Sequence, residues 1–300
     1  MKALIVGYGS IGQRHERLLK GLGLTVGMVS RHAPGAFLDL KTGVSDFKPD
    51  YVVIANPTDE HLGSLAVLGQ TGYRGKVLIE KPLFSDPTAI PELQTSEVYV
   101  AYQLRFHPAL VQLKSLIRGA KIISVNAYVG QYLPMWRPGR DYRERYSASR
   151  EKGGGVIRDL SHELDYLNWL FGKPESLTAV QAKWSQLEIT SDDTCQVMMR
   201  FQGQGAASLE VNYNDRMVQR YLTVNTQEHT YRVDLISGRL NIDTQIQDLH
   251  CEVDHPYVQM HRSILSENGK NVCTLGEGVE ILNQIAKIEK ASASKTWVAV

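Results

Sequence analysis

Cysteine, net charge and long apolar runs are all scarce in this sequence of 300 residues. The three cysteines are far apart and form no CxxC pair, which argues against a disulfide framework or a metal site and favours a reducing cytoplasm. The 33 basic and 32 acidic residues leave a formal net charge of +1, so nothing electrostatic indicates a nucleic-acid or membrane-surface partner. The opening apolar run is about six residues long, far below the ~20 that cross a bilayer, so we expect no membrane partner.

The first hundred residues alternate short apolar runs with helical patterns. Strands are predicted at 3–6, 24–30, 51–55, 76–79 and 98–102, and helices at 11–22 and 58–71. Parallel strands need crossover connections, so this alternation predicts a parallel, doubly wound Rossmann sheet.

The order of predicted elements changes after a predicted helix at 108–118. Helices are predicted at 155–170 and 276–290, a strand at 122–129, a series of strands over 176–243, and an end strand at 297–300. Strand after strand with short turns predicts a mostly antiparallel sheet. We therefore expect an α/β protein with two domains: a Rossmann domain over 1–118, and over 119–300 an α+β domain with an open sheet.

A glycine-rich segment joins the first predicted strand to the first predicted helix. Its letters, Gly7-Tyr8-Gly9-Ser10-Ile11-Gly12, match G-x-G-x-x-G in the strand-to-helix context that the motif requires. Glycines there allow a tight turn, close approach of a pyrophosphate, and close helix–strand packing. We expect Gly7, Gly9, Ser10, Ile11 and Gly12 to bind the pyrophosphate of a dinucleotide; the alternative is a glycine-rich turn without a ligand.

The end of the second predicted strand bears on which dinucleotide binds. A carboxylate there would hydrogen-bond the adenosine ribose and repel a 2′-phosphate, but the chain has Ser30 and Arg31. Both side chains suit a phosphate, so we expect NADP(H) to be preferred over NAD(H). If Arg31 is an ordinary solvated residue, both cofactors are used.

Three further segments follow in order: Ala55-Asn56-Pro57-Thr58-Asp59-Glu60-His61, Glu80-Lys81-Pro82, and Gly153-Gly154-Gly155 with His162-Glu163-Leu164-Asp165. With these motifs at these intervals, the chain resembles the Gfo/Idh/MocA oxidoreductases, the relatives of glucose–fructose oxidoreductase and inositol dehydrogenase. The resemblance runs from residue 1 to nearly 300. It implies hydride transfer between a nicotinamide and a hydroxyl or keto carbon of a sugar derivative. It also implies a homodimer or homotetramer formed through the C-terminal sheet.

Lys81 and His162 are the catalytic candidates. Lys81 follows the fourth predicted strand, at the sheet edge where ligands bind, and it can stabilise charge developing on the reacting oxygen. In this family the peptide before Pro82 is often cis. An imidazole titrates near neutral pH, so His162 can take the hydroxyl proton; the alternatives are a packing histidine or one that only positions substrate.

One departure from the family pattern lies just before His162. Many members carry Asp four residues earlier, where this chain has Arg158 and places Asp159 one step later. Asp159 either orients His162 or is a plain helix residue. Asp165, three residues after His162, would share its helix face, and Arg158 would face an anionic substrate.

The resemblance also assigns cofactor contacts. Asn56, Pro57, Thr58 and His61 would lie along the cofactor, although Thr58 also suits a helix N-cap. Glu80 would hold Lys81 or the nicotinamide ribose. Gln103 would face the nicotinamide, where family members often have Asn.

The segment 130–152 is rich in arginine and aromatic residues: Trp136, Arg137, Arg140, Tyr142, Arg143, Arg145 and Tyr146. We interpret it as a lid over a sugar, since arginine grips carboxylate or phosphate and aromatic rings stack on a pyranose. A solvated flap and a subunit contact are the alternatives. The predicted substrate contacts are Trp136, Arg143, Arg105, Arg158 and Asp165.

The function predicted from these features is an NAD(P)-dependent oxidoreductase acting on a sugar derivative, such as a nucleotide sugar or an acidic sugar of surface-polysaccharide synthesis. Two other hypotheses stay open. One is a sensor of the same fold that binds dinucleotide without turnover. The other is an enzyme that uses bound cofactor transiently in a net elimination or hydrolysis.

Overall fold

The structure is a computed structural model that describes residues 1–85, 97–266 and 269–300. It contains two compact units, one formed by Met1–Gln103 with Asp254–Leu282 and the other by Leu104–Val253 with Asn283–Val300. The sequence-based division at residue 118 cut the chain once, whereas each unit is built from two separate stretches of chain.

The first unit is built on a six-stranded sheet in the order β14-β5-β4-β3-β1-β2. The strands are β1 (Lys2–Val6), β2 (Thr25–Val29), β3 (Tyr51–Ile54), β4 (Lys76–Ile79), β5 (Val98–Val100) and β14 (Cys273–Thr274). All pair in parallel except β14, which is antiparallel to β5. Every residue of β3 is buried, as expected for a strand covered on both faces. The strand order reverses between β1 and β3, and ligands of doubly wound sheets bind at such a switch point.

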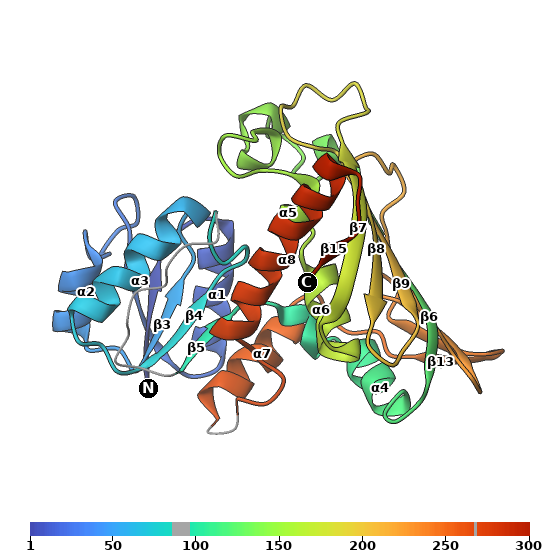
Figure 1. The fold of residues 1–300 in the computed structure, drawn as a ribbon. Helices are drawn as coiled ribbons and strands as arrows, with labels where there is room; N and C mark the ends of the chain where they lie inside the picture. The colour runs from blue at the N-terminus through green and yellow to red at the C-terminus, as the bar shows by residue number, and fades with distance from the viewer. Residues whose placement is uncertain (86–96, 267–268) are drawn as a thin grey trace. The chain divides into compact units, whose positions relative to one another are not determined.

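Helices connect and cover these strands: α1 (Ser10–Gly21), α2 (Leu40–Phe47), α3 (His61–Gln70) and α7 (His255–Leu265), with a 3-10 turn η1 at Thr58–Glu60 (Figure 1). The sequence analysis predicted α1 but missed α2 and α7. Helix α2 has eight residues and an internal glycine, Gly43, which weakens the helical pattern. Its start is instead fixed by Asp39, whose carboxylate accepts the Thr42 N–H at 2.8 Å.

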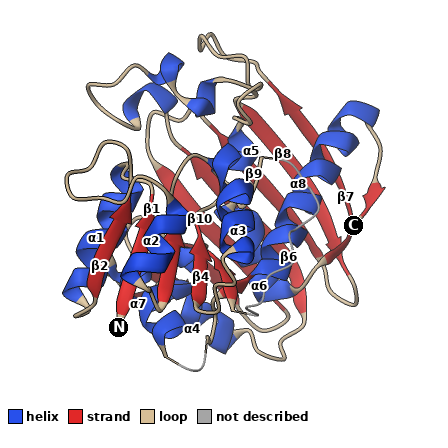
Figure 2. Ribbon diagram, turned by 90° about the vertical axis from the view of Figure 1, so that its left-hand side faces the viewer, coloured by secondary structure: helices blue, strands red, loops and turns tan. Residues whose placement is uncertain are grey.

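The second unit is built on a nine-stranded sheet in the order β13-β12-β11-β10-β6-β9-β8-β7-β15. Its strands are β6 (Ile122–Gly130), β7 (Pro174–Ala182), β8 (Thr194–Phe201), β9 (Ala206–Asn212), β10 (Gln219–Thr226), β11 (Thr230–Asp234), β12 (Arg239–Ile242), β13 (Gln245–Asp248) and β15 (Val298–Ala299). Only the β6–β9 pair is parallel among these described strands. Figure 2 shows β7, β8 and β9 side by side. The predicted fold class is confirmed.

One face of the nine-stranded sheet is packed and the other is open. Along β6, Val125, Ala127 and Val129 are buried, while Asn126 is exposed and Tyr128 half-buried. This alternation is typical of an antiparallel sheet with one solvated face. Helices α5 (Val156–Asp159) and α6 (His162–Phe171) lie on the packed side (Figure 1).

The remaining elements are α4 (Pro108–Leu116), α8 (Leu275–Ser294) and four 3-10 turns, η2 (Gln103–Phe106), η3 (Leu133–Met135), η4 (Tyr142–Glu144) and η5 (Tyr146–Ala148). Helix α8 begins in the first unit and ends in the second. Within the described ranges, no helix is both long and apolar enough to cross a bilayer. Cys195 and Cys273 are buried, and no disulfide bond joins any of the three cysteines, all of which lie within the described ranges.

The single helix predicted over 155–170 is wrong. Leu160 leaves the helical conformation, with φ −100° and ψ 36°, and separates α5 from α6. Asp159 therefore ends one helix and His162 begins the next, so the two do not share one continuous helix face. Asp165 does lie on α6, three residues after His162.

Candidate functional site

The glycine loop after β1 is built from two glycines that tolerate no side chain and one that has room for a side chain. Gly7 has φ +99°, and a Cβ there would lie 2.6 Å from the Asn56 nitrogen. A Cβ on Gly12 would collide with the Gly7 carbonyl oxygen. A Cβ on Gly9 would meet no other described atom within 4 Å. Gly7 and Gly12 therefore serve the close packing of the loop on β3 and α1, while Gly9 faces open space.

That open space lies at the N-terminus of α1. Gly9 is the N-cap, Ser10 begins the helix and is exposed, and Ile11 is half-buried. The first N–H groups of a helix have no acceptor within the helix, and together with the helix dipole they attract anions. Because Gly9 adds no side chain, a pyrophosphate can approach the backbone there. The residues present thus fit the dinucleotide that the sequence predicts.

Ser30 and Arg31 lie directly after β2, next to this loop in the sheet. Ser30 is half-buried, and its Oγ accepts the His32 N–H at 3.1 Å. Arg31 is exposed. No carboxylate follows β2 in the Val29-Ser30-Arg31-His32 segment.

The segment after β3 is held by its own side chains. Asn56 Nδ2 donates to Glu60 Oε2 and to Ser64 Oγ, both at 3.0 Å. The His61 ring, 1% exposed, lies between the carbonyl oxygens of Asn56 and Leu83, each 3.0 Å from one ring nitrogen, and in its neutral form it donates to one of them. Burial lowers the pKa of His61. His61 therefore contacts the segment after β3 and the segment after β4. Its contact with the cofactor remains a prediction.

Pro57 and Thr58 belong to the same segment. Pro57 is exposed and precedes the turn η1, which Thr58 begins. Helix α3 begins only at His61, with Glu60 as its N-cap and no capping side chain. Thr58 therefore does not cap the helix, contrary to the alternative that its position suggested.

Glu80 and Lys81 follow β4 at the carboxyl edge of the sheet. The Lys81–Pro82 peptide is cis, as the family resemblance implies. Lys81 is half-buried, whereas Glu80 is 8% exposed. The Glu80 carboxylate accepts the Lys81 N–H at 3.2 Å through Oε2 and a His15 ring nitrogen contact at 2.8 Å through Oε1. Glu80 thus faces the interior of its own unit, beside the backbone of Lys81.

His162 and Asp159 lie in the second unit. His162 is 6% exposed at the start of α6. Asp159 is 4% exposed and accepts hydrogen bonds from two phenols, Tyr146 Oη at Oδ1 and Tyr213 Oη at Oδ2, the latter at 2.6 Å. Burial and the neighbouring Asp159 charge raise the pKa of Tyr213 well above its ordinary value. Asp159 therefore anchors the loop that carries Tyr146.

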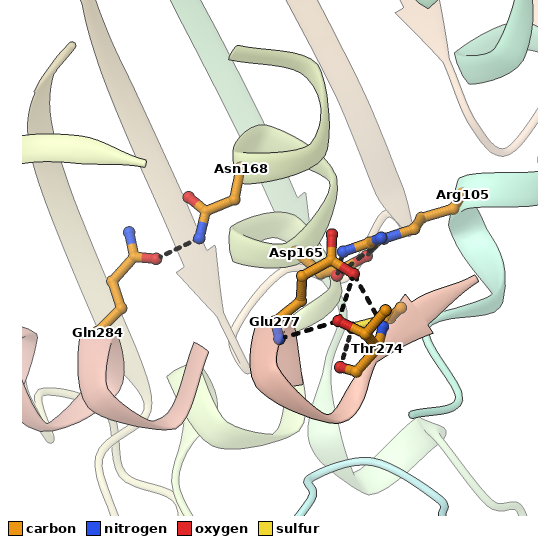
Figure 3. Close-up of polar contacts among 7 residues, drawn as sticks. Arg105, Asp165, Asn168, Thr274, Glu277 and Gln284 are labelled. Atoms are coloured by element: carbon orange, nitrogen blue, oxygen red, sulfur yellow. Dashed lines mark hydrogen bonds and ion pairs between the residues drawn. The ribbon is translucent and has the colours of Figure 1, made fainter. Parts of the chain in front are cut away.

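Arg105 and Asp165 form a buried ion pair. Arg105 Nη2 lies 2.7 Å from Asp165 Oδ1, and Nε contacts both carboxylate oxygens at 3.1 and 3.0 Å (Figure 3). Their side chains are 3% and 0% exposed. This geometry favours a structural role, with Arg105 fixing η2 to α6, over direct contact with substrate.

The loop between β6 and α5 holds the other predicted substrate contacts. Trp136 Nε1 donates to the Gln131 carbonyl oxygen at 3.1 Å, and its ring packs edge-on to Tyr213. Arg143 pairs with Asp141 at 2.7 Å and with Glu188 at 3.0 Å. Neutralising carboxylates therefore already surround Arg143.

Arg158 and Gln103 complete the predicted set. Arg158 pairs with Glu289 at 2.9 Å within the second unit. Gln103 is half-buried at the start of η2, in the first unit. Both assignments, to substrate and to nicotinamide respectively, remain predictions.

The glycines at 153–155 hold the base of the arginine-rich loop. A Cβ on Gly154 would collide with the Tyr146 carbonyl oxygen, and one on Gly155, with φ +148°, would lie 2.6 Å from Asp192 Oδ1. The Asp192 carboxylate accepts the Val156 N–H at 2.9 Å. Close packing explains these two glycines, against backbone oxygens at Gly154 and against the Asp192 carboxylate at Gly155.

The sequence analysis missed several polar groups buried behind the predicted site residues. His15 and His261 are both fully buried and bond to one another, and Tyr213 supports Asp159. The spacing of His15, three residues after Gly12 on the buried face of α1, was the available signal. Across the described ranges, no cluster of three His, Cys, Asp or Glu side chains could hold a metal ion.

Comparison with known proteins identifies the C-terminal part of the chain. Residues 110–232 match the family model of the GFO/IDH/MocA C-terminal domain. An uncharacterized oxidoreductase of Synechocystis sp. strain PCC 6803 is 36% identical over 143 residues, which span 43% of this chain and 36% of that protein's length. The resemblance inferred from the sequence motifs is confirmed.

Solved structures share the fold over the whole chain. Levoglucosan dehydrogenase in complex with NADH has a TM-score of 0.86 at 16% identity, covering 100% of this chain and 99% of its own. The WlbA dehydrogenase from Bordetella pertussis, in complex with NADH and UDP-GlcNAcA, has a TM-score of 0.79 at 22% identity, covering 100% and 98%. At these identities the likeness establishes the fold.

Proposed function

We propose that this chain, which carries the Gfo/Idh/MocA C-terminal domain on the fold of that family, is a nicotinamide-dinucleotide oxidoreductase acting on a hydroxyl or keto carbon of a sugar derivative. The observation that carries the proposal is the open face of Gly9 at the N-terminus of α1, between two glycines that are tightly packed. This arrangement supports binding of a pyrophosphate at the switch point of the sheet.

Bound there, the nicotinamide would accept or donate the hydride. The residues assigned to hold the cofactor are Gly7, Gly9, Ser10, Ile11, Gly12, Asn56, Pro57, Thr58, His61 and Gln103. Two structures of the same fold were solved with NADH, which favours a nicotinamide cofactor for this chain as well.

Lys81 and His162 are the proposed catalytic pair. The Lys81 ammonium donates a hydrogen bond to the substrate oxygen and stabilises the negative charge that develops on it. The His162 imidazole accepts the hydroxyl proton during oxidation and returns it during reduction. Asp159, fixed by two phenols, is a positioning group for the segment that leads into His162.

The catalytic pair is tested by alanine substitution with matched controls. Lys81→Ala and His162→Ala should each lower kcat by about 100-fold or more, the usual contribution of a general acid–base or charge-stabilising group. Cofactor affinity, measured by calorimetry, should stay unchanged. Lys121→Ala and His250→Ala, at exposed positions elsewhere, should keep full turnover. Wild-type kcat in either catalytic variant overturns the assignment.

NADP(H) is the proposed preference because Ser30 and Arg31 stand where a carboxylate would repel a 2′-phosphate. Loss of one charge-assisted phosphate contact costs about tenfold in affinity. Arg31→Ala should therefore raise the Kd of NADPH by about tenfold and leave that of NADH unchanged. His32→Ala is the neighbouring control. Equal effects on the two cofactors contradict the preference.

An anionic sugar is the proposed substrate class. Arg137, Arg140 and Arg145 belong to one short loop, which also carries Asp141 and Glu144. Burial, followed by the charges of Arg137 and Arg140, lowers the pKa of Arg145, while the Glu144 charge raises it. The arginines supply the donors that a carboxylate or phosphate needs. Among the same-fold structures, one was solved with UDP-GlcNAcA. Arg145→Ala should raise the KM for acidic or nucleotide sugars. It should leave kcat, and the KM for uncharged sugars, unchanged.

The proposed assembly is a homodimer or homotetramer. Its subunits contact one another through the open face of the nine-stranded sheet. That face exposes Met198 on β8, which is 53% exposed. Met198→Arg should shift the mass measured by light scattering towards the monomer. Ile236→Arg, equally exposed but on a turn, should not. A monomeric wild-type chain contradicts this proposal.

A further inference from the structure

Four buried polar side chains form one continuous hydrogen-bonded chain inside the first unit. Tyr51 Oη lies 3.1 Å from His261 Nδ1, His261 Nε2 lies 2.8 Å from His15 Nδ1, and His15 Nε2 lies 2.8 Å from Glu80 Oε1. Tyr51, His15 and His261 are 0% exposed, and Glu80 is 8% exposed. The chain joins β3, α7 and α1 to the residue that precedes Lys81.

The chemistry of the groups gives this chain a direction. Burial raises the pKa of Tyr51 well above its ordinary value, so its hydroxyl keeps its proton. In the described part of the protein, the acceptor for that proton is His261 Nδ1. Burial and the His15 ring lower the pKa of His261 well below its ordinary value, so this ring is neutral. A neutral imidazole carries one donor and one acceptor, so the His261 proton is on Nε2.

The same reasoning extends to Glu80. His261 Nε2–H donates to His15 Nδ1, which leaves the His15 proton on Nε2, directed at Glu80 Oε1. The reverse tautomers would turn His261 Nδ1–H towards the Tyr51 oxygen and leave the buried hydroxyl proton without its acceptor, which is unfavourable. Glu80 therefore receives His15 Nε2–H on one oxygen and Lys81 N–H on the other.

We propose that Tyr51, His261 and His15 are positioning residues that fix the Glu80 carboxylate, and through it the backbone of Lys81, for catalysis. None of the three contacts substrate in this proposal. The inference rests on the proposed function in assigning the catalytic role to Lys81. The hydrogen-bond chain itself does not depend on that assignment.

The first test measures the tautomers of the two histidines in the hydrogen-bond chain, in the protein without substrate. In ¹⁵N-histidine-labelled wild-type protein near neutral pH, His15 and His261 should both give the nitrogen shifts of the neutral Nε2–H tautomer. A doubly protonated His15, or an Nδ1–H tautomer of either ring, overturns the proposed direction. Tyr51→Phe removes the hydroxyl that donates to His261 Nδ1. In this variant His261 should no longer be held in the Nε2–H tautomer, and its nitrogen shifts should change.

The second test measures the effect on Lys81. His15→Leu removes both ring nitrogens, and the Lys81 amide proton should then exchange faster with solvent. If the proposed function holds, this variant should also lose kcat by about tenfold with cofactor Kd and KM within about twofold, the pattern of a lost transition-state interaction. His15→Gln, whose amide can both donate and accept, should restore part of kcat. Wild-type kcat and Lys81 exchange in a folded His15→Leu variant overturn the proposal.

Leu19→Ala separates positioning from general destabilisation. Leu19 is fully buried on the same helix as His15. Its truncation therefore lowers stability without removing any member of the hydrogen-bond chain. It should keep the Lys81 exchange rate and kcat of the wild type. An inactive wild-type protein with the expected tautomers and Lys81 exchange would defeat the proposed function and leave the hydrogen-bond chain intact.

Discussion

Three glycines of one short loop differ in what surrounds them, and this difference separates folding from binding. Gly7 and Gly12 lie against backbone atoms, whereas Gly9 faces open space. The G-x-G-x-x-G pattern predicts this difference, because the middle glycine is the one that a pyrophosphate approaches. The pattern does not predict that Gly7 packs against the backbone of Asn56, which follows β3.

Stability measurements should reveal this difference directly. Gly12→Ala forces a Cβ into the Gly7 carbonyl, and overpacking against fixed backbone costs about 1–3 kcal/mol or more. Gly9→Ala meets no clash and should cost only the poorer N-cap, at most about 1 kcal/mol. Chemical denaturation of both variants beside the wild type checks this. Equal destabilisation by the two substitutions would contradict the assignment.

Individual residue roles were the least predictable part of the site. The sequence analysis predicts Arg105, Arg143 and Arg158 as substrate contacts. In the structure each pairs with a carboxylate: Arg105 with Asp165, Arg158 with Glu289, and Arg143 with Asp141 and Glu188. Apart from Asp141, these partners are 45 or more positions away along the chain, so local spacing cannot reveal them.

At the scale of elements, strands were predicted well and helix boundaries less so. Lys76–Ile79 and the other buried strands are unmistakable apolar runs. The break between α5 and α6 was missed because residues 155–170 look continuously helical. The Asp159 carboxylate at the end of α5 binds phenols from the loop and from the segment after β9, so tertiary contacts accompany the break.

The Tyr213–Asp159 hydrogen bond should stabilise this junction measurably. Tyr213 is 0% exposed, and its hydroxyl lies 2.6 Å from Asp159 Oδ2. Tyr213→Phe should lower the free energy of unfolding by about 1–3 kcal/mol, since it removes a donor from a buried carboxylate. Tyr142→Phe, which loses only an exposed contact with the Glu188 N–H, should cost less than about 0.5 kcal/mol. Denaturant titration of both variants decides, and no loss in Tyr213→Phe would contradict the account.

At the scale of the whole molecule, the order of elements predicts the fold class but not the composition of the units. Residues 254–282 return to the first unit and add α7 and β14. This return brings His261 against His15, 246 positions away. Long-range closures of this kind are set by packing of the complete chain.

Buried neutral histidines should make stability depend on pH. Burial lowers the pKa of His61, and burial with the His15 ring lowers that of His261. Below the unfolded value of about 6.5, the unfolded chain binds protons that the folded chain does not, so the free energy of unfolding falls as the pH falls. The slope approaches about 1.4 kcal/mol per pH unit for each histidine.

Denaturant titrations between about pH 7.5 and about pH 5.5 measure this slope above the ordinary carboxyl range. Burial raises the pKa of Asp192, and its contribution, which is lost as the pH rises, has the opposite sign. His61→Gln should reduce the slope by about half, while the exposed His250→Gln should leave it unchanged. A stability that rises on acidification would contradict the neutral, buried state of both rings.

The central claim is that the loop from Gly7 to Gly12 binds a nicotinamide dinucleotide, and calorimetric titration of the purified chain with NADPH and NADH tests it most directly. The account predicts saturable binding at one site per chain, tighter for NADPH, and weakened at least about tenfold in Gly9→Ala because a methyl group occupies the space left for the pyrophosphate. Gly21→Ala, whose Cβ also meets open space but at the other end of α1, should bind as the wild type does. Absence of binding to the wild type, or undiminished binding to Gly9→Ala, would contradict the claim.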